Sequence, residues 1–215
     1  MQTYTTIVRF FQEGGMFMYP IMLVLALGVA VAVERYMYLS ASTLRNRRMW
    51  DQLLPVLQSG KYQQAISATQ KSDVAIAKIL GYGLARIKSA RRREDIEMAM
   101  EEGLMEIIPR LERRTHYLSA FANIATLLGL LGTIIGLIQA FTAVANANPA
   151  EKAELLSSSI SVAMNTTAFG LIVAIPLLLI YSVLQSKTTQ IVDSLEMAAV
   201  KFLNIVTERS REGAA

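Results

Sequence analysis

The sequence predicts an all-α membrane protein with three transmembrane helices, and three observations support this fold class. Hydrophobic residues make up 53% of the 215 residues, whereas soluble domains usually contain about 45–50%. Charged residues make up only 18% of the chain and are concentrated between apolar runs. Three apolar runs reach the roughly 20 residues that a helix needs to cross the hydrocarbon core of a bilayer.

The first apolar run is predicted to cross the membrane over residues 16–39, with an uncharged core at residues 16–33. A cleaved signal peptide is the alternative, because Ala30-Val31-Ala32 imitates a small-residue cleavage site. We favour a retained helix, since the preceding leader is long and the apolar core exceeds that of a typical signal peptide.

Two further runs, residues 117–145 and residues 155–185, contain no charged residue and are predicted as the second and third spans. A short polar link, residues 146–154, joins them. The Asn148-Pro149 pair in this link favours a break between two helices.

The distribution of Lys and Arg predicts the orientation of the spans. Most basic residues lie in residues 40–116, whereas the leader contains only Arg9 and the link only Lys152. Because positive residues stay inside, residues 40–116 and the tail at residues 186–215 are expected in the cytoplasm. The N-terminal segment, residues 1–15, is then periplasmic, and it is expected to be amphipathic.

The cytoplasmic residues are predicted to form a helical domain extended by long helices from the membrane. The Ser59-Gly60 pair should end the first cytoplasmic helix. The last helix before the second span is expected to run on into that span, unless Pro109 kinks or breaks it. The amphipathic tail should pack with these helices in a bundle. Helical periodicity marks residues 61–70, 73–88, 91–112 and 186–211.

Small residues recur at spacings of three and four along the second and third spans, so they share one face of each helix. Such faces let transmembrane helices approach closely, because packing drives helix association in lipid. The simplest interpretation is tight helix packing. The residues assigned to it are Gly129, Gly132, Gly136, Gly170, Ala163 and Ala174.

Hydroxyl and amide side chains in the same spans are candidates for lining an ion pathway. The threonines could instead bond to carbonyls one turn earlier, as often happens in membrane helices. However, the third span is polar for a membrane helix, and polar residues at that depth usually face a bundle interior or a wet pathway. The candidates are Thr133, Thr167, Thr166, Ser159 and Asn165.

Neither of these two spans contains a carboxylate, a lysine or a histidine. A proton relay generally needs a titratable group within the membrane. Glu34 and Arg35 lie at the cytoplasmic end of the first span, and they are interpreted as an interfacial ion pair or anchor. If the chain conducts ions, a partner protein must therefore supply the charge.

The composition argues against several other classes of function. Cysteine is absent and His116 is the single histidine, so no disulfide framework or Cys/His metal site is expected. No catalytic residues, phosphate-binding loop or cofactor site is expected either, which argues against an enzyme. The basic residues sit between apolar runs, so nucleic acid is not an expected partner.

Three motifs resemble those of the ExbB/TolQ/MotA proton-channel family, and especially its ExbB-like members. The second span contains LLGLLGTIIGLIQAF at residues 127–141, and the third contains NTTAFGLIVAIP at residues 165–176. The sequence GGMFMYP at residues 14–20, followed by Glu34-Arg35, is similar to the first span of ExbB-like members. The resemblance covers all three spans in order, with the large cytoplasmic insertion in the right place.

The resemblance implies a homopentameric ring around single-span helices of an ExbD/TolR-type partner, which brings a membrane aspartate. Such rings couple the proton motive force to mechanical work, through TonB and outer-membrane transport in the ExbB type and for envelope integrity in the TolQ type. Thr133 and Thr167 match the family's pore-facing threonines. The implied location is the bacterial inner membrane, with the N-terminus in the periplasm and the C-terminus in the cytoplasm.

One departure from the family pattern concerns the transported ion. The enteric ExbB pattern has a glutamate in the third span where this chain has Val162. The Thr166-Thr167 doublet resembles sodium-driven members, so the expected ion is H⁺ with Na⁺ as the alternative. A passive ion channel and a structural membrane scaffold are the competing classes: the first predicts conductance without a partner, and the second predicts that Thr133 and Thr167 tolerate valine.

Overall fold

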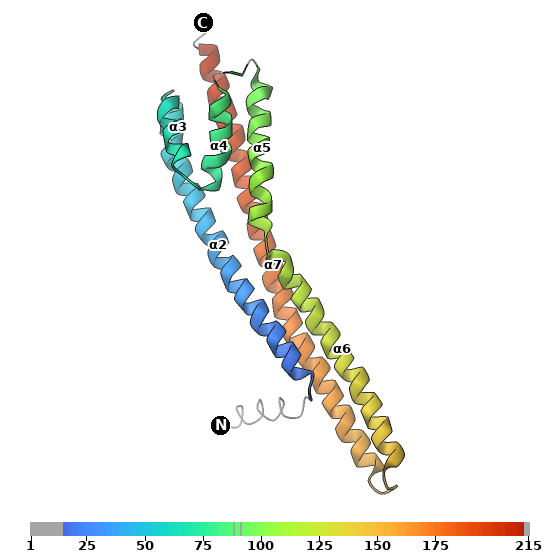
Figure 1. Ribbon diagram of the computed structural model, residues 1–215. Coiled ribbons are helices and arrows are strands. Elements are labelled where there is room, and N and C mark those ends of the chain that lie inside the picture. The colour runs from blue at the N-terminus through green and yellow to red at the C-terminus, as the bar shows by residue number, and fades with distance from the viewer. Residues whose placement is uncertain (1–14, 88, 91, 213–215) are drawn as a thin grey trace, which may run out of the picture. The chain divides into compact units, whose positions relative to one another are not determined.

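A computed structural model of the chain describes residues 15–87, 89–90 and 92–212. Among these residues the secondary structure consists of helices joined by short turns (Figure 1). Three of the helices, α2, α6 and α7, contain stretches long and apolar enough to cross a membrane. This confirms the predicted fold class. The helices are α2 (Met18–Gln58), α3 (Tyr62–Gln70), α4 (Ala75–Arg86), α5 (Arg93–Glu112), α6 (Thr115–Asn146) and α7 (Lys152–Glu212).

The chain divides into two compact units. The first, called the span unit here, comprises residues 1–34 and 114–183; the second, called the bundle unit, comprises residues 35–113 and 184–215. The periplasmic segment predicted over residues 1–15 lies outside the described residues except for Gly15. The prediction of an amphipathic segment there therefore stays a prediction.

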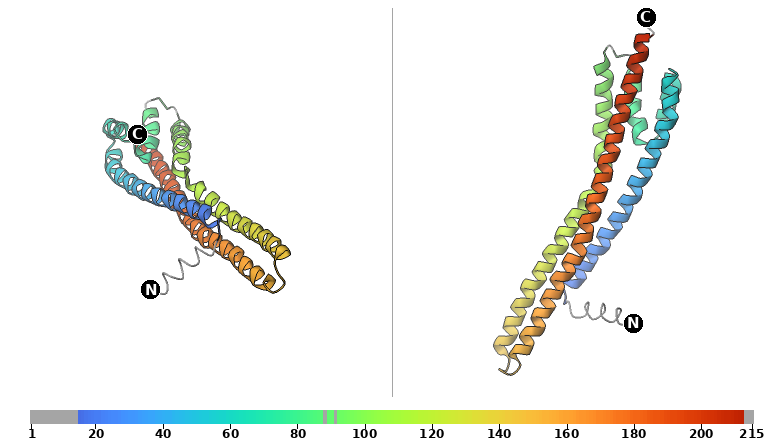
Figure 2. Two further views of the ribbon diagram at one scale, coloured as in Figure 1. Left: turned by 60° about the horizontal axis from the view of Figure 1, so that its bottom comes forward. Right: turned by 180° about the vertical axis from the view of Figure 1, so that it is seen from behind.

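In the span unit, α6 runs beside the N-terminal half of α7 (Figures 1 and 2). The N-terminal part of α2 packs on α7, where Gly28 makes room for a buried leucine: a Cβ atom built on Gly28 would lie 2.7 Å from the Cδ2 atom of Leu177. Ile21 of α2 is also fully buried. Most large apolar side chains of α6 and α7 point outward, as expected for helices that face lipid or other protein chains.

The bundle unit contains α3, α4 and α5 together with one end of α2 and one end of α7. Its core includes Leu57, Leu80 and Phe202, each less than 2% exposed. Gly83 of α4 lets this core close, because a Cβ atom there would lie 2.9 Å from both Met100 and Phe202. Burying side chains of this size contributes about 1.5–3 kcal/mol each, which explains why the predicted amphipathic helices gather in a bundle.

Polar side chains satisfy the helix ends of the bundle unit. The buried Asn46 accepts a hydrogen bond from the Ile76 backbone N–H at 3.1 Å, in the first turn of α4. The guanidinium of Arg35, only 3% exposed, donates to the Leu111 carbonyl in the last turn of α5. Both groups would otherwise be unsatisfied backbone atoms at a helix terminus.

The predicted helices are found, with two differences in how they join. The first cytoplasmic helix is not separate from the first span, because α2 continues unbroken from the span to Gln58. The turn after α2 contains Gly60, whose φ of +74° favours glycine. The prediction that the helix over residues 91–112 runs on into the second span is wrong. The chain breaks at Arg114, which has a φ of 67°, five residues after the helix-weakening Pro109.

Candidate ion-pathway site

Small residues bring the backbones of α6 and α7 close together. A Cβ atom built on Gly170 would lie 2.7 Å from the carbonyl oxygen of Ala125 and 3.1 Å from the Cα atom of Gly129. A Cβ atom on Gly136 would lie 2.8 Å from the Cβ atom of Ala163. The small faces of the two spans therefore pack against each other within one chain.

Two threonines meet across this close approach. The Oγ1 atoms of Thr133 in α6 and Thr167 in α7 are hydrogen-bonded to each other. Each also contacts the carbonyl oxygen of Gly129, at 3.1 Å for Thr133 and 3.0 Å for Thr167. Three oxygen atoms from two helices thus form one cluster, which we call the hydroxyl cluster.

The chemistry of the hydroxyl cluster follows from its hydrogen count. The three oxygen–oxygen contacts share only two hydrogens, because each of the two threonine hydroxyls has one hydrogen and two lone pairs. Lone pairs are therefore left over, and both threonine side chains are half-buried and not sealed in the core. Such oxygen atoms can accept a hydrogen bond from a proton carrier or coordinate a small cation.

Thr166 occupies a different place from its neighbour. It is only 2% exposed, and its methyl group packs on Gly132, where a built Cβ atom would lie 2.5 Å from the Thr166 Cγ2 atom. Its hydroxyl donates to the Val162 carbonyl at 3.0 Å, one turn earlier. Thr166 therefore belongs to the α6–α7 contact.

The remaining polar candidates are not gathered at the hydroxyl cluster. Ser159 lies eight residues before Thr167, on the same face of α7 but about 12 Å along the axis. Asn165 lies about 200° around the helix from Thr167, on another face. Ala174, assigned to packing, is 2% exposed, which agrees with a contact position.

Both charges at the end of the first span have contacts with other residues. Glu34 forms an ion pair with Arg114 at 3.6 Å, and both side chains are about half exposed. Arg35 instead lies over the ring of Tyr38, 4.8 Å from its centroid, while it donates to the end of α5. Glu34 is thus paired with the residue that precedes α6, and Arg35 contacts Tyr38 and the end of α5 in the bundle unit.

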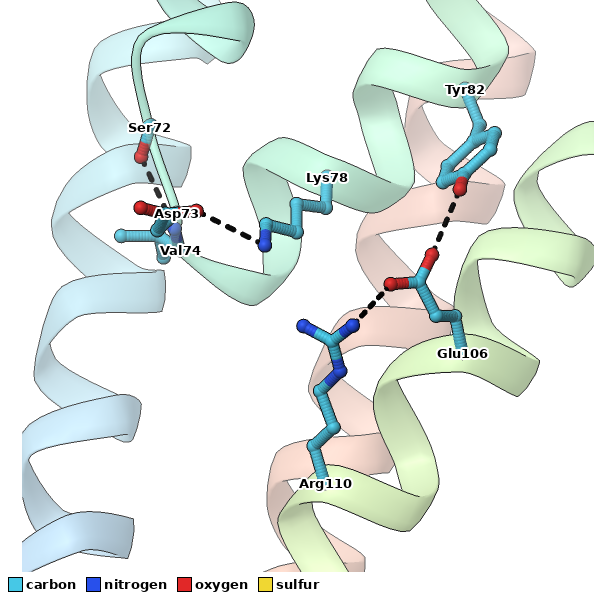
Figure 3. Close-up of polar contacts among 7 residues, drawn as sticks. All are labelled: Ser72, Asp73, Val74, Lys78, Tyr82, Glu106 and Arg110. Carbon is cyan, nitrogen blue, oxygen red and sulfur yellow. Dashed lines mark hydrogen bonds and ion pairs between the residues drawn. The ribbon is translucent and has the colours of Figure 1, made fainter.

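A second polar cluster lies in the bundle unit, between α4 and α5 (Figure 3). The Tyr82 hydroxyl donates to Glu106 at 2.8 Å, and Arg110 pairs with the other oxygen of the same carboxylate at 2.5 Å. The hydrogen bond to Glu106, together with its negative charge, raises the pKa of the Tyr82 phenol. Lys78 pairs with Asp73 at 3.1 Å.

Sequence patterns did not identify two participants in these sites. The Gly129 carbonyl is a backbone atom, and its only signal is that glycine lies four residues before Thr133, where a threonine hydroxyl bonds back. Arg114 was counted with the other basic residues before the second span. Its ion pair depends on a helix break whose position the sequence indicated only through Pro109.

Three helices are long and apolar enough to cross a membrane, and two of them meet at the hydroxyl cluster. Residues 117–145 and 155–185 contain no charged residue. These features define a polytopic membrane protein of the transport type. Residues 71–197 match the model of the family described as the MotA/TolQ/ExbB proton channel family. The chain belongs to this family and lies close to its ExbB-like members. It is an inner-membrane protein and a subunit of an energising motor, and its family consists of transport proteins described as proton channels and not of enzymes.

Individual relatives agree with this assignment. The chain is 30% identical to a putative biopolymer transport protein ExbB-like 3 of Synechocystis over 80% of this chain and 82% of the relative. It is 29% identical to a putative biopolymer transport protein ExbB homolog of Methanothermobacter thermautotrophicus over 89% of this chain and 67% of the relative. The similarity to the Tol-Pal system protein TolQ of Haemophilus influenzae is 32% identity over 50% of this chain and 44% of the relative.

Proposed function

We propose that the chain is the ring subunit of an ExbB-type motor. In this proposal, five copies surround the single-span helices of an ExbD/TolR-type partner. The ring couples the proton motive force to outer-membrane transport through a TonB-like protein. The extent of the match to ExbB-like relatives, over four-fifths or more of this chain, supports the ExbB type.

The hydroxyl cluster carries this proposal. It lies within two spans that contain no carboxylate, lysine, arginine or histidine, so another molecule must bring the charge if the cluster is to pass or hold an ion. A membrane aspartate on the partner would supply it. Thr133 and Thr167 would then accept or donate hydrogen bonds as the carboxylate changes its protonation state.

The outward faces of the spans are suited to an assembly in lipid. Leu127, Ile134 and Phe141 lie seven residues apart on α6 and are 62%, 49% and 63% exposed in the single chain. In a ring these side chains would contact lipid or the next copy. Ring formation would also leave the small-residue contact between α6 and α7 intact, because that contact lies within one chain.

The proposed topology follows the distribution of basic residues. The spans are residues 16–39, 117–145 and 155–185, with residues 1–15 and the link at 146–154 in the periplasm. Residues 40–116 and 186–215 are cytoplasmic, and they would contain most of the bundle unit. The basic residues of this unit support the assignment.

The proposed ion is H⁺, with Na⁺ as the alternative. Sodium is considered because Thr133, Thr166 and Thr167 together offer three hydroxyls, and a dehydrated sodium ion needs several oxygen ligands. However, the Thr166 hydroxyl bonds to its own helix at the Val162 carbonyl. Motor activity at fixed membrane potential, with and without sodium, decides between the two ions, and activity independent of sodium supports H⁺.

Isolation of a complex tests the proposal. The chain is co-expressed with an ExbD/TolR-type single-span protein from the same genome, and the mass of the purified assembly gives the copy number. We expect five copies of this chain with the partner. Replacing the partner's membrane aspartate by asparagine should abolish activity and leave the complex intact. Failure to recover any complex, with both proteins expressed, contradicts the motor assignment.

A TolQ-type role is the second candidate, because the similarity to the Haemophilus influenzae TolQ protein covers half of this chain. Deletion of the gene separates the two roles. Loss of energised uptake across the outer membrane supports the ExbB type, whereas detergent sensitivity and leakage of periplasmic proteins with normal uptake support the TolQ type.

A further inference from the structure

The bundle unit contains a cleft of about 670 Å³ that the proposed motor function does not use. Its walls come from α2, from the turn between α3 and α4, from the first turn of α4 and from the last turns of α5. A volume in this range is typical of sites that bind small molecules. All of its lining residues belong to the bundle unit.

The cleft is strongly basic. Arg45, Lys71, Lys78 and Arg110 line it, against the single carboxylate of Asp73. Figure 3 shows Lys78 on α4 and Arg110 on α5 with their paired carboxylates. The Asp73 side chain is fully exposed to solvent, so its pair with Lys78 is screened and holds that lysine only weakly.

Two of the four cations have no carboxylate within 4.0 Å among the residues that the structure describes, namely Arg45 and Lys71. They enter the cleft from two different segments, α2 and the turn after α3. The hydroxyl of Ser42 lies in the same lining. Cations and a hydroxyl that converge from separate elements form the kind of donor set that holds a phosphate group.

Part of the lining is apolar and comes from the segments of α2 and α5 next to the proposed spans in the sequence. Met37 and Tyr38 line the cleft at the end of the proposed first span, and Leu111 closes it from α5. Arg45 lies six residues beyond Leu39, about 9 Å along the helix axis. Side chains on a helix lean toward its N-terminus, so the long Arg45 side chain leans toward the headgroup layer.

The geometry points to a binding site for the phosphate headgroup of an anionic glycerophospholipid from the inner leaflet. The basic residues hold the phosphate, and Met37, Tyr38 and Leu111 contact the glycerol and the first carbons of the acyl chains. Basic pockets at the cytoplasmic ends of transmembrane helices favour anionic lipids in this way. This inference rests on the topology in the proposed function, which puts the cleft on the cytoplasmic side.

The apolar wall distinguishes this ligand from others of the same charge. A free phosphate ion would use the cations but not the wall formed by Met37, Tyr38 and Leu111. An acidic peptide would carry several carboxylates, whereas only two of the cations lack a partner. A single phosphate with an apolar tail matches both parts of the lining.

Lipid retention tests the site. The full-length chain is reconstituted, with its partner, in nanodiscs of phosphatidylcholine with and without phosphatidylglycerol. Native mass spectrometry then counts the lipids that stay bound. We expect retained phosphatidylglycerol on the unmodified chain and roughly 30-fold weaker retention for the double variant Arg45→Gln/Lys71→Gln, since each of the two basic residues near the surface contributes about 1 kcal/mol.

The matched control is Arg47→Gln/Lys201→Gln, which removes the same charge from exposed positions outside the cleft. It should retain phosphatidylglycerol as the unmodified chain does. Equal retention by both double variants, or no preference for phosphatidylglycerol over phosphatidylcholine, overturns the inference. A further experiment adds glycerol phosphate to the chain in phosphatidylcholine nanodiscs and measures the unfolding temperature. If glycerol phosphate raises this temperature as much as phosphatidylglycerol does, the ligand is a soluble phosphate and the inferred lipid site is wrong.

The two proposals fail in different ways. If the complex with the single-span partner forms and the bundle unit is cytoplasmic, lost lipid preference contradicts only the lipid site. If thiol labelling of an Arg47→Cys variant shows that this position is periplasmic, the proposed topology is wrong, whichever lipid is retained. Circular dichroism of each variant checks that helix content is unchanged.

Discussion

At the scale of single residues, the contact between Thr133 and Thr167 is the most informative feature of the span unit. Both hydroxyls also reach the Gly129 carbonyl. The threonines could be selected from the sequence because they are polar residues in apolar helices. Their joint use of a backbone oxygen could not, since it depends on how far α6 is shifted along α7.

We expect Thr167→Val to reduce partner-dependent motor activity roughly 10- to 100-fold. The reason is that a hydrogen bond to a charged group is worth about 1.5–3 kcal/mol. Thr167→Ser keeps the hydroxyl and should restore most of the activity. Energised uptake in cells that carry each variant is the measurement.

The matched control for this series is Thr126→Val. Thr126 is exposed, and its hydroxyl donates only within its own helix, to the Ala122 carbonyl at 3.1 Å. It should keep normal activity. If Thr167→Val is as active as this control, the hydroxyl cluster takes no part in coupling.

The Tyr82 phenol gives a pH-dependent prediction outside the membrane. Its pKa is raised because it donates to the ionised Glu106. The contact therefore stabilises the fold below the ordinary tyrosine pKa of about 10, and this contribution is lost as the pH rises through the raised value. NMR titration of labelled tyrosine should show Glu106→Gln returning the pKa toward its ordinary value. An unchanged titration in that variant would mean that the hydrogen bond does not form in solution.

At the scale of helices, α6 and α7 were predictable as apolar, uncharged runs with small faces. The sequence indicated which faces are small and that they pack tightly, but it did not indicate which helix is the partner of each face. The structure puts Gly170 against Ala125 and Gly129 of the same chain. Pattern alone could not make this choice, because the same stripe serves either partner.

We expect Gly170→Val to destabilise the span unit by about 1–3 kcal/mol, since its Cβ atom would overlap the Ala125 carbonyl oxygen, which cannot rotate away. Thermal unfolding in detergent micelles measures the loss. The control is Gly81→Ala in α4, where the nearest atoms would lie 3.7 Å away and alanine should be neutral or stabilising by up to about 1 kcal/mol. Equal stability of Gly170→Val and the unmodified chain would contradict the close approach.

The helix ends of the bundle unit were only partly predictable. Gly60 was identified as a terminator because glycine tolerates a positive φ. Arg35 and Asn46 were not identified as partners of helix ends, since each satisfies a backbone group far away in the sequence. Such contacts between distant segments leave no periodic signal.

At the scale of the whole molecule, the sequence predicted three spans and a helical bundle from charge and apolar periodicity. The boundary between the two units was less accessible. It falls within α2 and within α7, where the helices do not break, and at Arg114, where the chain does. Local patterns detect helix ends, but they cannot detect a change of surroundings along a continuous helix.

The absence of cysteine makes the topology directly measurable. We expect Asn148→Cys, in the link between α6 and α7, to react with a membrane-impermeant thiol reagent from the periplasmic side of intact cells. Lys61→Cys, before α3, should react only after the inner membrane is opened. Reaction of both sites from the same side contradicts the proposed arrangement.

The interruption at Arg114 also determines where the chain tolerates changes in length. One residue inserted into α2 or α7 rotates every later side chain of that helix by about 100°. An insertion beside Arg114 does not rotate the side chains of α6 relative to one another, because α6 begins as a new helix at Thr115. Loop-length variation within the family should therefore accumulate at this junction, where it does not turn Thr133 away from Thr167.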